Sequence, residues 1–76
     1  MDTWESSRQV KLLEERYHEI HRHSLGVRAR LAAIRAYDGE LSREELHRGQ
    51  AELAEAERDK RAILVAIEAI EDQLVE

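Results

Sequence analysis

The sequence predicts an all-α protein in which two long helices pack antiparallel as a coiled-coil hairpin. Apolar residues recur at alternating steps of three and four in both halves of the chain, so they line one face of a helix in each half. The stretch 38–42 between the halves contains a glycine, and the chain has no proline to interrupt either helix. We therefore expect a single domain over residues 1–76, with helices at about 3–37 and 43–75 and a turn at 38–42.

The two apolar stripes also predict the register in which the helices pair. When the chain is folded about residue 40, the stripe residues of the two halves face each other in pairs. The two residue numbers of each pair add up to 80. A seam of this kind is the interface of an antiparallel coiled coil. The first stripe comprises Val10, Leu13, Tyr17, Ile20, Ser24, Val27, Leu31 and Ile34, and the second comprises Leu46, Gly49, Leu53, Ala56, Lys60, Ile63, Ile67, Ile70 and Leu74.

The turn contains signals for ending one helix and starting the next. Gly39 can adopt the left-handed conformation that is common just after a helix. Ser42 and Glu45 are spaced as a capping box, and Leu41 and Leu46 are spaced as the hydrophobic staple that accompanies one. The second helix is therefore expected to start at residue 43.

Small residues occupy the middle of the predicted seam. Ser24 faces Ala56 and Leu31 faces Gly49, so the two helices can approach each other closely there. Gly26 lies outside the seam, where a glycine weakens a helix interior by about 1 kcal/mol relative to alanine. The sequence leaves open whether the first helix is broken or bent near this glycine.

The two halves of the chain carry opposite charges. Residues 16–37 contain five arginines and one glutamate, whereas residues 38–59 contain eight acidic residues and three arginines. A basic helix could bind nucleic acid, but the heptad positions place its basic flanks beside the acidic flanks of the other helix. We therefore expect no direct contact with nucleic acid. The expected flanking pairs are Arg30–Glu52, His23–Asp59, Arg28–Gln50 and His21–Glu57.

Several apolar residues lie outside the seam, and these predict an interface with another protein. A helix segment that is apolar on every side, as residues 63–67 are, is normally buried on every side. The favoured solution is a homodimer in which two hairpins form a four-helix bundle. The alternatives are a groove for a different protein and scattered surface residues of no consequence. The predicted interface residues are Trp4, Leu12, Leu25, Leu64, Val65 and Val75.

Two Glu-x-x-His strings raise the question of metal chemistry. Glu15 with His18 and Glu44 with His47 have the spacing that di-iron bundles use. All four fall at outer heptad positions, so we expect no metal site. The chain also has no cysteine, no phosphate-binding glycine loop and no arrangement of a nucleophile with a base. We expect no catalytic residues, no cofactor and no enzymatic activity.

Composition indicates a cytoplasmic protein without membrane contact. No apolar run reaches the ~20 residues of a membrane span, and the charged N-terminus is unlike a signal peptide. Ten arginines against two lysines are typical of a GC-rich bacterial genome. The expected function is that of a non-catalytic interaction module: an adaptor, an assembly scaffold or a small regulatory or inhibitory protein. The alternative is an accessory subunit that docks on a larger enzyme, such as one acting on nucleic acid, and a metal-binding bundle ranks third.

Overall fold

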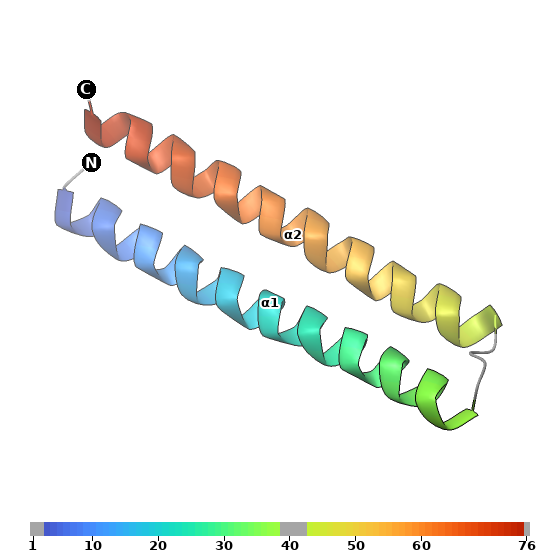
Figure 1. Cartoon of the computed structure of the whole chain (residues 1–76). Coiled ribbons are helices and arrows are strands. Elements are labelled where there is room, and N and C mark those ends of the chain that lie inside the picture. The colour runs from blue at the N-terminus through green and yellow to red at the C-terminus, as the bar shows by residue number, and fades with distance from the viewer. Residues whose placement is uncertain (1–2, 39–42, 76) are drawn as a thin grey trace.

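The computed structural model describes the backbone of residues 3–38 and 43–75, and the side chains of residues 3–36 and 43–74. All of these residues belong to two helices, α1 (Thr3–Asp38) and α2 (Arg43–Val75), which lie side by side and antiparallel (Figure 1). The molecule measures 55 × 15 × 13 Å. The prediction of an all-α helical hairpin is confirmed. Within the described ranges, neither helix is long and apolar enough to cross a membrane.

Some of the predicted features lie outside the described residues. These are the turn residues Gly39, Leu41 and Ser42, and with them the capping box and the hydrophobic staple. The side chain of Val75 is also outside the description. Helix α1 ends one residue beyond the predicted position, and α2 has the predicted bounds.

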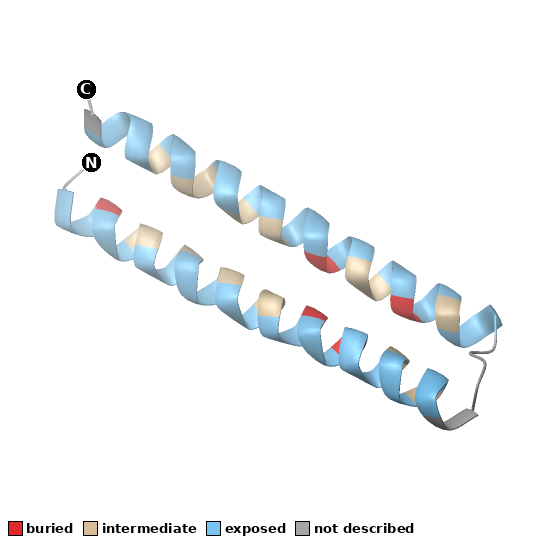
Figure 2. Cartoon of the chain, in the orientation of Figure 1, coloured by how far each residue is buried: buried red, intermediate tan, exposed pale blue. Residues whose placement is uncertain are grey.

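The seam follows the two apolar stripes. Every described stripe residue is buried or half-buried except Leu74, which is 41% exposed near the end of α2. These residues line the facing sides of the two helices (Figure 2). A Cβ atom placed on Gly49 would lie only 2.7 Å from Cδ1 of Leu31, which is the predicted partner of that glycine. The contact matches the register in which paired residue numbers add to 80.

The most deeply buried seam residues are small. Ser24, Val27 and Ala56 are each less than 5% exposed. The buried hydroxyl of Ser24 donates a hydrogen bond of 2.7 Å to the carbonyl oxygen of His21, one turn earlier. Helix α1 runs without interruption through Ser24 and Gly26, so the break that the sequence left open does not occur.

Candidate interaction surface

The predicted interface residues whose side chains are described are all exposed. Their exposed fractions range from 50% for Leu25 to 69% for Trp4, and Val65 is 61% exposed. Trp4 also lies against a cation, because the guanidinium carbon of Arg8 is 5.9 Å from the centre of its ring. These residues are therefore available to a partner.

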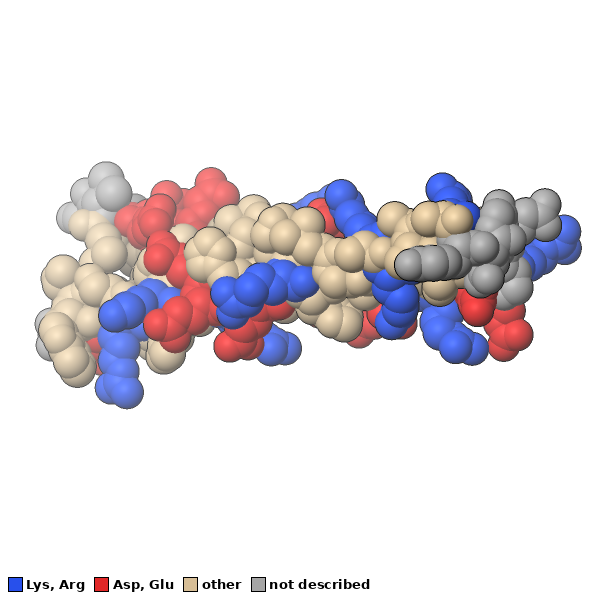
Figure 3. Space-filling model, turned by 60° about the horizontal axis from the view of Figure 1, so that its bottom comes forward, with Lys and Arg blue, Asp and Glu red and all other residues tan. Residues whose placement is uncertain are grey.

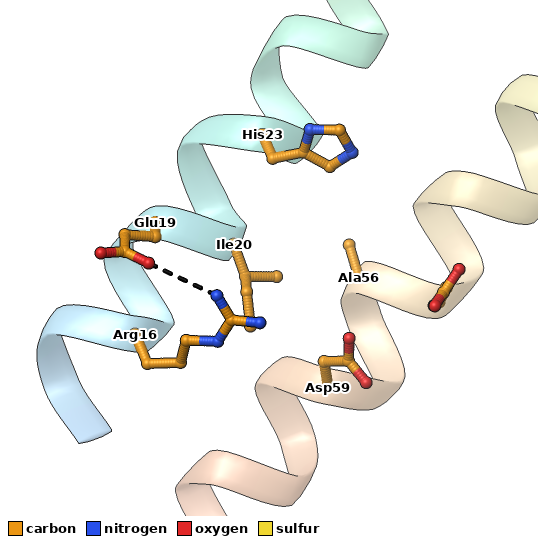
Figure 4. Close-up of a pocket in the computed structure, with 7 residues that line it drawn as sticks. Arg16, Glu19, Ile20, His23, Ala56 and Asp59 are labelled. Carbon is orange, nitrogen blue, oxygen red and sulfur yellow. Dashed lines mark hydrogen bonds and ion pairs between the residues drawn. The ribbon is translucent and has the colours of Figure 1, made fainter. Parts of the chain in front are cut away.

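The hairpin has two broad sides, on either side of the plane that contains both helix axes. His21 and His23 are two residues apart and so point in nearly opposite directions from α1. The first, which we call the His21 side, carries Tyr17, His21, Glu57 and Lys60. The second, which we call the His23 side, carries a groove lined by Arg16, Glu19, Ile20, His23, Glu55, Ala56 and Asp59 (Figure 4).

The predicted interface residues do not share one side. Helical geometry places Leu64, four residues after Lys60, on the His21 side, with Leu25, four residues after His21. Leu12, four residues before Arg16, lies on the His23 side. Val65 projects from the outer edge of α2. One flat interface cannot cover all of these residues, so the sequence-based grouping holds residues that belong to different surfaces.

The His21 side is organised by a lysine within the seam. The ammonium of Lys60 lies 3.2 Å from Oε1 of Glu57, 3.2 Å from Nδ1 of His21 and 5.5 Å from the centre of the Tyr17 ring. Its side chain is only 12% exposed. The ammonium is held above the ring and bridges the predicted pair His21–Glu57. Because an ammonium can only donate, Nδ1 of His21 must accept.

Ion pairs on the His23 side match the predicted pairs only in part. The predicted pair Arg30–Glu52 is present, with 3.4 Å between nitrogen and oxygen. His23 was expected beside Asp59, but its Nε2 lies 3.8 Å from Glu52. The carboxylate of Glu52 therefore lies beside both the Arg30 guanidinium and the His23 ring. Heptad position predicts which side of the hairpin a residue occupies, but a flexible side chain can reach a carboxylate two turns away from the expected one.

Charges of both signs are interspersed over the surface. On the face drawn in Figure 3, basic and acidic side chains alternate along the molecule and leave uncharged surface exposed between them. In the groove of the His23 side, Arg16 lies 3.4 Å from Glu19. Surface ion pairs of this kind contribute roughly 0–1 kcal/mol each. They orient helices and partners more than they stabilise the fold.

A second apolar stripe runs along α2. Ala62, Val65, Ala66 and Ala69 follow steps of three and four, and we call them the alanine–valine face. Ala66 is half-buried on the His23 side, and the other three are exposed. Sequence reasoning noted that residues 63–67 are apolar all round but did not recognise this stripe, although its spacing is visible in the sequence.

The histidine and carboxylate strings lie on the outside. Glu15, His18, Glu44 and His47 are all exposed. Among the described residues, no group of three or more histidines and carboxylates is arranged to hold a metal ion. No protein-family model matches the chain, and neither a curated protein nor a solved structure matches it.

Proposed function

We propose that this chain is a non-catalytic protein–protein interaction module that works as a homodimer, in the manner of an adaptor, an assembly scaffold or a small regulatory protein. The observation that carries the proposal is the mismatch between the size of the chain and its exposed area. The hairpin exposes 6078 Å². A compact monomer of 8.9 kDa would expose about 4,800 Å².

The dimensions of the molecule support the same conclusion. Its radius of gyration is 17.2 Å, whereas a compact domain of this length has one of about 11 Å. The excess exposed area, on the order of 1,300 Å², is larger than the ~800 Å² that each partner contributes to a standard interface. A second copy could therefore cover enough surface to give this chain a second layer.

The exposed apolar residues supply the driving force for such an assembly. Burial of apolar surface contributes about 25 cal/mol per Å², and a small chain without disulfides usually needs a partner or a metal for stability. Leu12, Leu25, Leu64 and Val65 are each at least half exposed in the single hairpin. Because these residues lie on different surfaces, a second copy would bury those on the surface that it covers, and their burial would offset the entropic cost of association.

The mass of the protein in solution tests the proposal. We expect sedimentation equilibrium to give twice the chain mass of 8.9 kDa at micromolar concentrations. Val65→Asp should lower the fraction of dimer, because it places a charge among apolar side chains. Ala51→Asp is the matched control, since Ala51 is exposed on the same face of α2, fourteen residues nearer the turn. A mass of one chain at every concentration would contradict the homodimer and favour docking on a different protein.

A further inference from the structure

We infer that the second copy packs on the His23 side of the hairpin, with its α1 over α2 of the first copy and its α2 over α1. The two-fold axis then runs along the helices, and the open ends of the two hairpins lie together. This inference rests on the proposed homodimer and specifies its interface. The interface buries Leu12 and is bordered by Val65, whereas Leu25 and Leu64 stay outside because they lie on the His21 side.

The groove of the His23 side continues toward the termini as a surface without charge. In a coiled coil, residues seven apart repeat on one line along the helix, so the groove residues identify further positions on the same side. Between residues 6 and 13 of α1 and between residues 62 and 73 of α2, none of these positions holds a charged residue. We call the apolar residues at six of them the terminal patch: Leu12, Leu13, Ile63, Ala66, Ala69 and Ile70. The other positions hold serine, glutamine and alanine.

The terminal patch offers large apolar side chains from both helices. Leu12 is 55% exposed, and the larger seam residues of the patch are only half-buried. The same stretch of the His21 side, by contrast, carries Lys11, Glu14 and Glu71 around a single pocket. A contiguous apolar surface is what distinguishes a binding surface from single exposed residues. The terminal patch is therefore the part of the hairpin best suited to contact a second copy.

The contrast between the two halves of the His23 side selects the orientation of the copies. Near the turn, this side carries charged residues such as Arg30 and Glu52. A two-fold axis across the helices at mid-length would cover these charges with the apolar half of the other copy, and burial of charges against apolar surface is costly. A two-fold axis along the helices brings like halves together and lets the copies overlap over the full length of 55 Å.

The shapes of the side chains fit this orientation. In it, α1 and α2 of the second copy are antiparallel and level with each other as they are within one hairpin, where paired residue numbers add up to 80. Leu12 is then level with residue 68 and lies between Ala66 and Ala69 of the second copy. Small side chains let the two helices approach and leave room for the leucine. The symmetry makes the same contact twice in each dimer.

The polar residues of the groove fit the same orientation. Around the groove, α1 contributes Arg16 and His23 as well as Glu19, whereas the charged residues of α2 there are both acidic, Glu55 and Asp59 (Figure 4). His23 is level with residue 57 and so lies between Glu55 and Asp59 of the second copy, where its ring can donate a hydrogen bond. Within the described part of a single chain, neither of these two acids forms an ion pair. The second copy therefore brings a hydrogen-bond donor to carboxylates that the first copy leaves unpaired.

Two matched leucines test which side forms the interface. Leu12 and Leu25 both belong to α1 and are 55% and 50% exposed, but they lie on opposite sides of the hairpin. Leu12→Asp should raise the dissociation constant of the dimer roughly tenfold or more, because it buries a charge against apolar side chains. Leu25→Asp should leave the dissociation constant nearly unchanged, and circular dichroism checks that both variants remain helical. An equal or larger effect of Leu25→Asp would overturn this interface.

Cross-linking tests the orientation of the copies. The chain has no cysteine, so single cysteine variants can be linked without background. In an equimolar mixture, a short bismaleimide should join Leu12→Cys chains to Ala69→Cys chains and should join neither variant to itself. A link between two Leu12→Cys chains, or a wild-type dimer whose variants give no link between Leu12→Cys and Ala69→Cys, would overturn this arrangement and leave the homodimer standing. A wild-type monomer would instead overturn the proposed function.

Discussion

The half of the hairpin near the turn and the half near the termini differ in the size and burial of their seam side chains. Near the turn, Val27 and Ala56 are buried and Arg30 forms its ion pair with Glu52. Near the termini, the seam contains larger side chains such as Leu13 and Ile67, which are only half-buried. The larger seam residues near the turn, such as Leu31 and Leu53, are also half-buried, so the two halves differ in their share of small seam residues and not in how completely they enclose large ones.

Side-chain size explains this difference. The described residues that are buried are all small or β-branched and short: Ser6, Ser24, Val27, Gly49 and Ala56. Two helices form a single layer of contact, and only a short side chain fits wholly within it. Longer side chains extend past the edges of the seam, where only a second layer could cover them. Apolar content alone therefore does not predict burial in a two-helix fold.

The largest change in the free energy of unfolding is expected when a seam side chain near the turn is enlarged. Ala56→Leu should destabilise the hairpin by about 1–3 kcal/mol, because the enlarged side chain has no space between α2 and the serine that it faces. Ala54→Leu is the control, since Ala54 is exposed two residues away. Chemical denaturation measures both. Equal costs for the two variants would show that the helices are not in close contact at Ala56.

The two described glycines should respond differently to the same substitution. Gly26→Ala should raise the free energy of unfolding by about 1 kcal/mol, because alanine favours the helix and its Cβ would meet nothing within 4 Å. Gly49→Ala should lose that gain, because its Cβ would lie 2.7 Å from Cδ1 of Leu31. In a Leu31→Ala background the gain at position 49 should return. Equal stabilisation at both glycines in the wild-type background would contradict the predicted close packing.

A smaller effect is expected from the ion pair between the helices. A double-mutant cycle with Arg30→Ala and Glu52→Ala should give a coupling energy of about 0.2–1 kcal/mol that decreases with added salt. The cycle Arg16→Ala with Asp59→Ala serves as the control, because Arg16 pairs with Glu19. No coupling between Arg30 and Glu52 would contradict a stabilising ion pair between the two helices.

The fold was predictable from the sequence to a large extent, whereas the surface was predictable only in part. The steps of three and four determine which residues face the other helix, so the Leu31–Gly49 contact and the Arg30–Glu52 pair followed from periodicity. The positions of the Lys60 ammonium and the His23 ring depend on side-chain torsions, which periodicity does not determine. Heptad positions also place Leu12 and Leu64 on opposite sides of the hairpin. The predicted interface included both because both are apolar, without regard to their sides.

The dependence of the melting temperature on protein concentration tests most directly whether a second copy supplies the missing layer. If two hairpins unfold together, mass action raises the melting temperature as the concentration increases. We expect a rise of roughly 5–10 °C over a hundredfold range for the wild-type protein. Val65→Asp should reduce this rise, and Ala51→Asp should preserve it. A wild-type melting temperature that is constant over the same range would contradict self-association.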